Sequence, residues 1–136
     1  MTADSDPFDV TPFEQIGDYV VVKPIGRGGF GSVYFVRDAT TNAPFAMKVQ
    51  KKGSHGNFDS EYVVLSLLQD SPFFPALNFY GEHNGLKYIV MELMGPSLSD
   101  IVTMLPERVL TPSSALRTAA ETLRIITNLH SHGFIH

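Results

Sequence analysis

The chain has 136 residues, the length of one ordinary domain, so it can bury a single hydrophobic core. Its formal net charge is −4, from 10 basic and 14 acidic residues, which excludes a basic surface for nucleic acid or anionic membranes, and no apolar stretch approaches the length of a membrane span. The sequence contains no cysteine, which excludes disulfide frameworks and thiolate metal sites and fits a reducing compartment. We therefore expect a globular, cytoplasmic or nuclear protein that binds neither nucleic acid nor membrane.

Residues 1–16 carry Asp, Pro and Thr without a hydrophobic period and without the layout of a signal peptide. This segment is predicted to be a flexible leader, or to lie loosely over the fold.

From residue 19 onward, β-branched and aromatic runs alternate with glycines. Residues 19–22 and 32–36 flank the sequence GRGGFG and predict a hairpin. Residues 45–49 follow a polar turn and predict a third strand. We expect the three strands to form an antiparallel meander.

The segment 57–69 changes its period. Apolar residues recur in it at helical spacings: Phe58, Val64, Leu65 and Leu68. The pattern predicts one amphipathic helix of about three turns, with acidic residues at its favourable N-terminal end.

Two further strands are predicted at residues 76–83 and 86–93. Asn84 and Gly85 join them, a dipeptide that tolerates the positive φ angles of a tight hairpin. The sequence therefore predicts five strands and one helix before Met94.

Beyond Met94 the pattern becomes helical. Ser97 and Asp100 have the spacing of a capping box for a short helix that ends near Leu105. Thr111 as N-cap and Pro112 at the first helical position begin a longer helix that reaches about His132. Apolar residues recur along the longer helix at three- and four-residue steps: Leu116, Ala120, Leu123, Ile126 and Leu129.

Gly26, Gly28 and Gly31 form a G-x-G-x-x-G pattern. Glycines let a backbone approach phosphate closely and leave its N–H groups pointing at the anion. The pattern alone is weak, because it also occurs in dinucleotide-binding folds and in plain turns. A dinucleotide fingerprint needs a helix directly afterwards, and here a strand follows.

Lys48 lies between apolar residues on the third predicted strand, where alternation places it on one face with Ala46. A lysine beside a glycine loop can hold phosphate oxygens as a point charge, although a lysine on an edge strand is a common alternative. Glu61 follows 13 residues later in the predicted helix, where it can reach Lys48. A lone helical glutamate is usually a solvated residue, so its significance depends on the combination.

Together these features resemble a protein kinase over residues 18–136. The glycine loop, the strand lysine, the helix glutamate and a hydrophobic strand running into a linker occur in the order of that family. The sequence VMELMGPSL is similar to the hinge of the casein-kinase-one group, while EYVVLSLLQ and HSHGFIH resemble its tau-tubulin-kinase branch. The resemblance implies an α+β fold: a five-stranded antiparallel sheet with one helix at residues 17–94, then the first helices of an incomplete C-lobe at 95–136.

The resemblance also implies a role for each site residue, with ATP as the ligand. Gly26, Gly28 and Gly31 would cover the phosphates, and Lys48 would grip them with Glu61 as its partner. The adenine would be enclosed by residues of three strands and the hinge: Ile25, Val33, Ala46 and the gatekeeper Met91, with hydrogen bonds from the Glu92 carbonyl and the Met94 N–H.

In the family, a His-Arg-Asp catalytic loop follows the long helix, and His136 fits its histidine. The catalytic Asp and both magnesium ligands of the family would come later, so we expect the 136 residues to contain no catalytic residue and to transfer no phosphate. Asp100 and Glu107 are expected to be solvated rather than to replace them. The spacing of His130, His132 and His136 does not place them on one helical face, so no metal site is expected.

Apolar residues lie on more than one side of the helix after Thr111, and we expect this surface to bind a protein partner or to aggregate. The parent protein would phosphorylate Ser or Thr of a protein substrate with ATP and magnesium. The alternative is a non-catalytic module that binds nucleotide or a partner and regulates by occupancy. If the chain were a purely structural β-rich domain, the occurrence of Lys48, Glu61 and the glycine loop in this order would be a coincidence.

Overall fold

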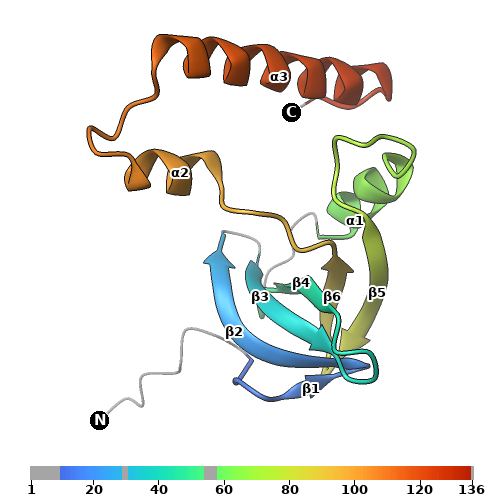
Figure 1. The fold of residues 1–136 in the computed structure, drawn as a ribbon. Coiled ribbons are helices and arrows are strands. Elements are labelled where there is room, and N and C mark those ends of the chain that lie inside the picture. The colour runs from blue at the N-terminus through green and yellow to red at the C-terminus, as the bar shows by residue number, and fades with distance from the viewer. Residues whose placement is uncertain (1–9, 29–30, 54–57, 136) are drawn as a thin grey trace.

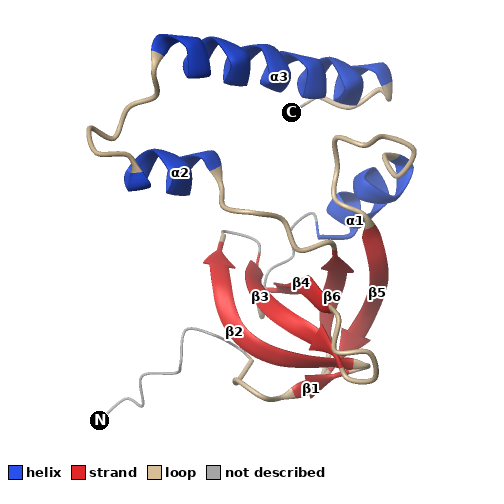
Figure 2. Cartoon of the chain, in the orientation of Figure 1, coloured by secondary structure: helices blue, strands red, loops and turns tan. Residues whose placement is uncertain are grey.

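The computed structural model describes residues 10–28, 31–53 and 58–135. Within these ranges, six strands and three helices follow one another (Figures 1 and 2): β1 Gln15–Ile16, β2 Tyr19–Arg27, β3 Gly31–Asp38, β4 Pro44–Gln50, α1 Phe58–Leu67, β5 Leu77–His83, β6 Leu86–Met91, α2 Leu98–Met104 and α3 Pro112–Ser131. The strands form one antiparallel sheet in the order β1-β2-β3-β4-β6-β5. The predicted α+β fold class is confirmed.

The sheet has one strand more than the five predicted. β1 pairs with the start of β2, with Gln15 opposite Val20 and Ile16 opposite Tyr19. Val10 and Ile16, which fall in the segment predicted to be a flexible leader, are 5% and 2% exposed. Residues 10–16 therefore lie against the sheet, whereas residues 1–9 are outside the described part of the chain. The predicted domain boundaries remain predictions.

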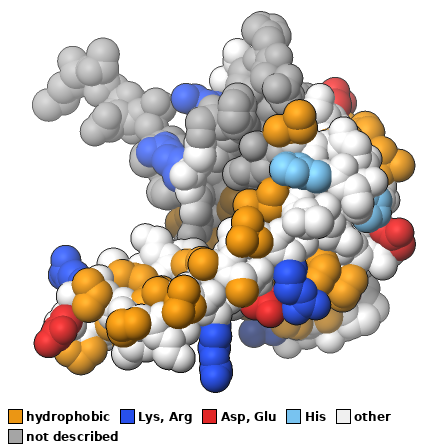
Figure 3. Space-filling model, turned by 90° about the horizontal axis from the view of Figure 1, so that it is seen from above, with side chains coloured by type: hydrophobic (Ala, Val, Ile, Leu, Met, Phe, Trp, Pro, Cys, Tyr) orange, Lys and Arg blue, Asp and Glu red, His pale blue; other side chains and the backbone are white. Residues whose placement is uncertain are grey.

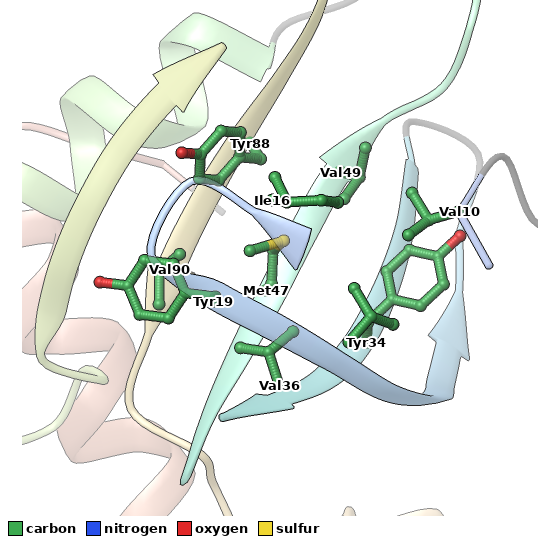
Figure 4. Close-up of a cluster of buried hydrophobic side chains, with 10 residues drawn as sticks. Val10, Ile16, Tyr19, Tyr34, Val36, Met47, Val49, Tyr88 and Val90 are labelled. Atoms are coloured by element: carbon green, nitrogen blue, oxygen red, sulfur yellow. The ribbon is translucent and has the colours of Figure 1, made fainter. Parts of the chain in front are cut away.

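The curled sheet encloses an apolar core on one face. Its buried residues come from the segment before β1 and from β1, β2, β3, β4 and β6 (Figure 4): Val10, Ile16, Tyr19, Val21, Tyr34, Val36, Met47, Val49, Tyr88 and Val90. The β-branched residues of the predicted strands supply much of this cluster, because their side chains suit a pleated, buried surface.

A second, smaller cluster lies between α1 and the sheet. Phe58, Leu65 and Ile89 are buried there, with Tyr62 and Leu77 packed against them. Phe58, Tyr62 and Leu65 are spaced by four and three residues, so they share the helix face that meets the sheet. This contact fixes which way the remaining side chains of α1 point.

The β5–β6 hairpin turns as predicted. Asn84 and Gly85 have φ angles of 51° and 77°, the left-handed values that a tight hairpin of matching twist requires. The dipeptide thus sets the register that brings β6 back beside β4.

α2 and α3 lie beyond the open end of the sheet and are connected to it by the segment after β6 (Figure 1). The predicted caps are confirmed: Ser97 and Asp100 form a reciprocal capping box, and Thr111 caps α3 with Pro112 in the first turn. Much of their apolar surface is exposed, with Leu116 at 73% and Leu123 at 64%, and Figure 3 shows hydrophobic side chains spread over this side of the molecule. Within the described residues, no helix combines the length and hydropathy needed to cross a membrane.

Candidate functional site

The ammonium of Lys48 contacts the carboxylate of Glu61. Lys48 lies on β4 and is 19% exposed, and Glu61 lies in the first turn of α1 and is 40% exposed. Phe58 is buried three residues before Glu61, so the anchoring of the helix by that ring turns the glutamate toward β4. The structure therefore brings together the two side chains on which the sequence-based hypothesis depends.

The strand register places other predicted site residues on the same face as Lys48. Val33 is opposite Lys48, and Ala46 is opposite Met91. Directly opposed residues of antiparallel strands point to the same side of a sheet. Val33, Ala46, Lys48 and Met91 thus share one face, while the intervening β4 residues point into the core of Figure 4.

Gly26 lies in β2, Gly28 follows the end of β2, and Gly31 begins β3, while Gly29 and Phe30 lie outside the described residues. The Gly28 N–H donates to the Gly31 carbonyl at 2.8 Å, and Gly26 lies opposite Val33. A methyl group on Gly31 would lie 2.2 Å from the Val49 carbonyl oxygen, so only glycine fits against β4 at this point. Ile25, at a bulge of β2, is 46% exposed.

The predicted hinge begins where β6 ends. The Glu92 N–H donates to the Ala76 carbonyl at 2.8 Å, and the Glu92 carboxylate accepts from the Ala76 N–H at 3.1 Å. Glu92 is thereby held against the segment that precedes β5. Met94 is 59% exposed. The proposed adenine contacts of Glu92 and Met94 remain predictions.

A second acid–base pair, which the sequence did not reveal, joins the first turn of α1 to the sheet. Asp59 accepts from Lys87 of β6 at 2.5 Å and from the Tyr80 hydroxyl of β5 at 2.6 Å. The hydrogen bond from Lys87 lowers the pKa of Asp59, with a further contribution from Tyr80, and the same carboxylate raises the pKa of both partners. Tyr80 in turn stacks on Tyr62 at 4.2 Å between ring centroids.

Only the position of Asp59 gave a signal in the sequence, because acidic residues are favoured in the first helical turn. Nothing local links it to Lys87, which follows 28 residues later. The two acidic residues of this turn thus reach lysines on two neighbouring strands, Glu61 to β4 and Asp59 to β6.

The described residues contain no group of three or more side chains able to hold a metal ion. Asp100 accepts from the Ser97 hydroxyl and backbone N–H, which lowers the pKa of Asp100, so this carboxylate serves as a helix cap. His130 is exposed, His132 contacts Asp70, and His136 is outside the described part of the chain.

Chemically, the site presents an ammonium held in place by a carboxylate, on a sheet face that ends at a glycine turn. An ammonium with three donors can bind the oxygens of a phosphate as a point charge, and an adjacent carboxylate keeps it oriented. The apolar Val33 and Ala46 on the same face offer a surface for a flat, uncharged group.

The chain is similar in sequence to known proteins. A family model described as Protein kinase domain matches residues 19–136. A protein of Encephalitozoon cuniculi named "Probable casein kinase I homolog" is 31% identical over 125 residues, which are 90% of this chain and 39% of the relative. The "Casein kinase I homolog 3" of Schizosaccharomyces pombe is 30% identical over 119 residues, 87% of this chain and 27% of the relative.

A protein of Dictyostelium discoideum named "Probable serine/threonine-protein kinase" is also 30% identical, over 121 residues that are 88% of this chain and 24% of the relative. The chain thus spans 24% to 39% of the length of these three relatives.

Proposed function

Because this chain belongs to the protein kinase domain family, we propose that it forms the ATP-binding part of a Ser/Thr protein kinase. The observation that carries this proposal is the contact between Lys48 and Glu61 on the sheet face that also bears Val33 and Ala46. The curated relatives named as casein kinase I homologs support an assignment to the casein-kinase-one group. Within that group we propose the tau-tubulin-kinase-like branch, on the residues of HSHGFIH and EYVVLSLLQ.

In this proposal Lys48 binds phosphate oxygens of ATP, and Glu61 keeps the ammonium in position. Gly26, Gly28 and Gly31 let the β2–β3 turn lie close to the phosphates. At Gly31 the backbone of β4 also leaves no room for a side chain, so the packing of β3 on β4 requires glycine at that position as well. Adenine lies against an apolar lining made of Ile25, Val33, Ala46 and Met91, with the Glu92 carbonyl and Met94 N–H as hydrogen-bonding partners.

Phosphoryl transfer depends mainly on positioning and on electrostatic stabilisation of the transferred group. The residues of this chain would supply the positioning, because they would orient the triphosphate and cover it. Magnesium bound with ATP would neutralise charge on the phosphates. Since the described residues contain no cluster of metal ligands, we assign no residue of this chain to that ion.

We further propose that a polypeptide of these 136 residues binds ATP but transfers no measurable phosphate, because it contains no residue matching the catalytic Asp of the family. Incubation with ATP, magnesium and a Ser/Thr peptide library is expected to give no phosphopeptide above a boiled control. Phosphopeptide formation by the purified chain would contradict the proposal.

A second candidate function is a non-catalytic module that binds a protein partner through α2 and α3. The exposure of Leu116 and Leu123 on α3, and of Ile101 and Met104 on α2, favours such a surface. For the kinase we propose a cytoplasmic or nuclear location, where ATP and protein substrates are both present.

The test of ATP binding measures how much ATP stabilises the chain against thermal unfolding. At an ATP concentration 100-fold above Kd, the stabilisation is about 2.7 kcal/mol. Lys48→Met is expected to weaken binding about tenfold, which lowers the stabilisation to about 1.4 kcal/mol at the same concentration. Lys87→Met is the matched control, since Lys87 also pairs with an acidic residue of α1 but on the next strand. Equal stabilisation of the Lys48→Met variant and the unmodified chain would overturn the assignment.

A further inference from the structure

The loop between α1 and β5, residues 68–76, contacts two parts of the candidate site. Gln69 donates to the Leu65 carbonyl of α1 at 3.0 Å and accepts from the Leu77 N–H of β5 at 2.7 Å. Ala76, at the other end of the loop, holds Glu92 through the two hydrogen bonds described above. A displacement of this loop would therefore move both the helix that carries Glu61 and the start of the hinge.

The same loop is joined to the C-terminal half of α3, which lies above it in Figure 1. The Ser71 hydroxyl donates to the side-chain carbonyl of Asn128 at 2.8 Å, and Ser71 is 8% exposed. The Arg124 guanidinium lies over the Phe73 ring, 5.6 Å from its centroid, within the range of a cation–π contact. His132, at the C-terminal end of the helix, supplies the third contact.

The imidazole of His132 lies between two hydrogen-bond acceptors. Its Nδ1 is 2.8 Å from the backbone carbonyl oxygen of Asn128, and its Nε2 is 3.2 Å from a carboxylate oxygen of Asp70. A neutral imidazole carries one N–H and can donate to only one of these acceptors, whereas imidazolium donates to both. The position at the end of α3 also favours a cation, because the helix dipole is negative there.

The electrostatic surroundings agree with this geometry. Hydrogen bonding to the Asn128 carbonyl makes the largest contribution and raises the pKa of His132; desolvation lowers the pKa by less, and the interaction with Asp70 raises it further. Among the described residues, Asp70 is the ionisable group in contact with the ring. Further back along α3, Arg124 pairs with Glu121, and His130 is exposed.

We propose that His132 is a positioning residue that acts as a cation. As imidazolium it fastens α3 to residues 68–76 and so holds α1 and Glu92 in their places. After loss of one proton the ring keeps a single N–H, which stays with the nearer acceptor, the Asn128 carbonyl of α3; the hydrogen bond to Asp70 is then lost and the attachment to residues 68–76 loosens. Because the raised pKa is that of the folded protein, the attachment is complete below the ordinary histidine pKa of 6.5 and is lost as the pH rises through the higher folded value.

The test measures the distance between α1 and α3 as the pH is raised. Because the chain has no cysteine, two introduced cysteines would be the only sites to which thiol-reactive spin labels attach. We choose Leu67→Cys on α1 and Leu116→Cys on α3, since both positions are exposed. Pulsed electron resonance is expected to give one narrow distance distribution at pH 5.5 that broadens toward pH 8.5. NMR titration of the His132 ring should follow the same midpoint.

Three variants separate the charge of His132 from general packing. His132→Lys, which stays cationic, should keep the narrow distribution at pH 8.5. Asp70→Asn should lower the midpoint of the His132 titration measured by NMR. It should not unfold the protein, because the native Asp70 side chain is 75% exposed. Ser71→Ala, which removes a neutral contact of the same interface, should broaden the distribution at every pH without moving the midpoint.

A distribution that does not change with pH in the parent protein, or that changes equally in His132→Lys, would overturn the inference. The effect of the His132 attachment on ATP affinity rests on the proposed function and is measured in a separate experiment. The ATP affinity of the parent protein should fall relative to that of His132→Lys between pH 6 and pH 8.5; this comparison is needed because the terminal phosphate of ATP titrates near the same range. Distance changes without any ATP binding would contradict the proposed function and leave the His132 attachment supported.

Discussion

Lys48 and Glu61, 13 residues apart in the sequence, form an ion pair that joins a strand to a helix. Both side chains are partly shielded, with Lys48 the more buried of the two. An ammonium in such a position has fewer orientations available than one on a free lysine, because the carboxylate accepts one of its hydrogens. The pair therefore fixes where a negatively charged ligand can be bound.

The two residues are expected to act as one unit toward ATP. Glu61→Gln should weaken ATP binding by less than Lys48→Met, since the ammonium remains but is no longer oriented. The double variant should bind ATP no more weakly than Lys48→Met alone, because contacting residues are non-additive. Calorimetric titration of the four proteins gives the coupling energy. Additive losses would show that Glu61 does not act through Lys48.

Gly31 is expected to matter for the stability of the fold, and Gly26 to matter much less. Gly31→Ala forces a methyl group against the Val49 carbonyl and should destabilise the protein by about 1–3 kcal/mol. In Gly26→Ala the new methyl group would lie 3.7 Å from the nearest atom, an ordinary contact with Val33, so stability should change by about 0.5 kcal/mol or less. Urea unfolding of both variants measures the difference. Equal destabilisation would contradict the close approach of β3 and β4 at Gly31.

The Asp59–Lys87 pair predicts an acid-dependent loss of stability. The folded protein holds the pKa of Asp59 below its ordinary value of 3.8, so the pair stabilises above that value and is lost as the pH falls through the lowered one. Lys87→Met should raise the pKa of Asp59, and Tyr80→Phe should raise it by less, because Lys87 makes the larger contribution. NMR titration of the Asp59 carboxyl measures both shifts. An unchanged pKa in Lys87→Met would show that the pair does not form in solution.

The exposed leucines of α3 are expected to make the isolated chain self-associate. Leu116→Ser with Leu123→Ser should lower binding of a hydrophobic dye and raise the fraction of monomer in sedimentation, because the apolar surface of α3 shrinks. Leu67→Ser is the control, since Leu67 is 57% exposed but lies on α1. If the control has the same effect as the double variant, the surface responsible for self-association is not specific to α3.

Local patterns predicted most of this fold. The alternation around Lys48, the Asn84–Gly85 turn and the cap residues Ser97 and Thr111 each depend on neighbours within a few positions. The contact of Lys48 with Glu61 was predicted from the order of the motifs and is confirmed as a contact. Its role in binding ATP remains a prediction.

Contacts between distant segments were not predictable in this way. β1 consists of two residues in a polar stretch and forms only because β2 offers it a partner. Asp70 and His132 are 62 residues apart, and neither lies in a pattern that indicates the other. The spacing of His130 and His132 in the sequence bears only on metal binding, whereas the position of His132 between two acceptors depends on how α3 is placed in three dimensions.

The burial of Val10 and Ile16 has a consequence for where the folding unit starts. The family match begins at residue 19, and a protein trimmed to that limit would lose both side chains and β1. Burying an aliphatic side chain contributes about 1.5–3 kcal/mol, so the two together contribute about 3–6 kcal/mol of the 5–15 kcal/mol that holds a typical domain folded. The stretch matched by the family model is therefore shorter than the stretch that must be present for the sheet to be stable.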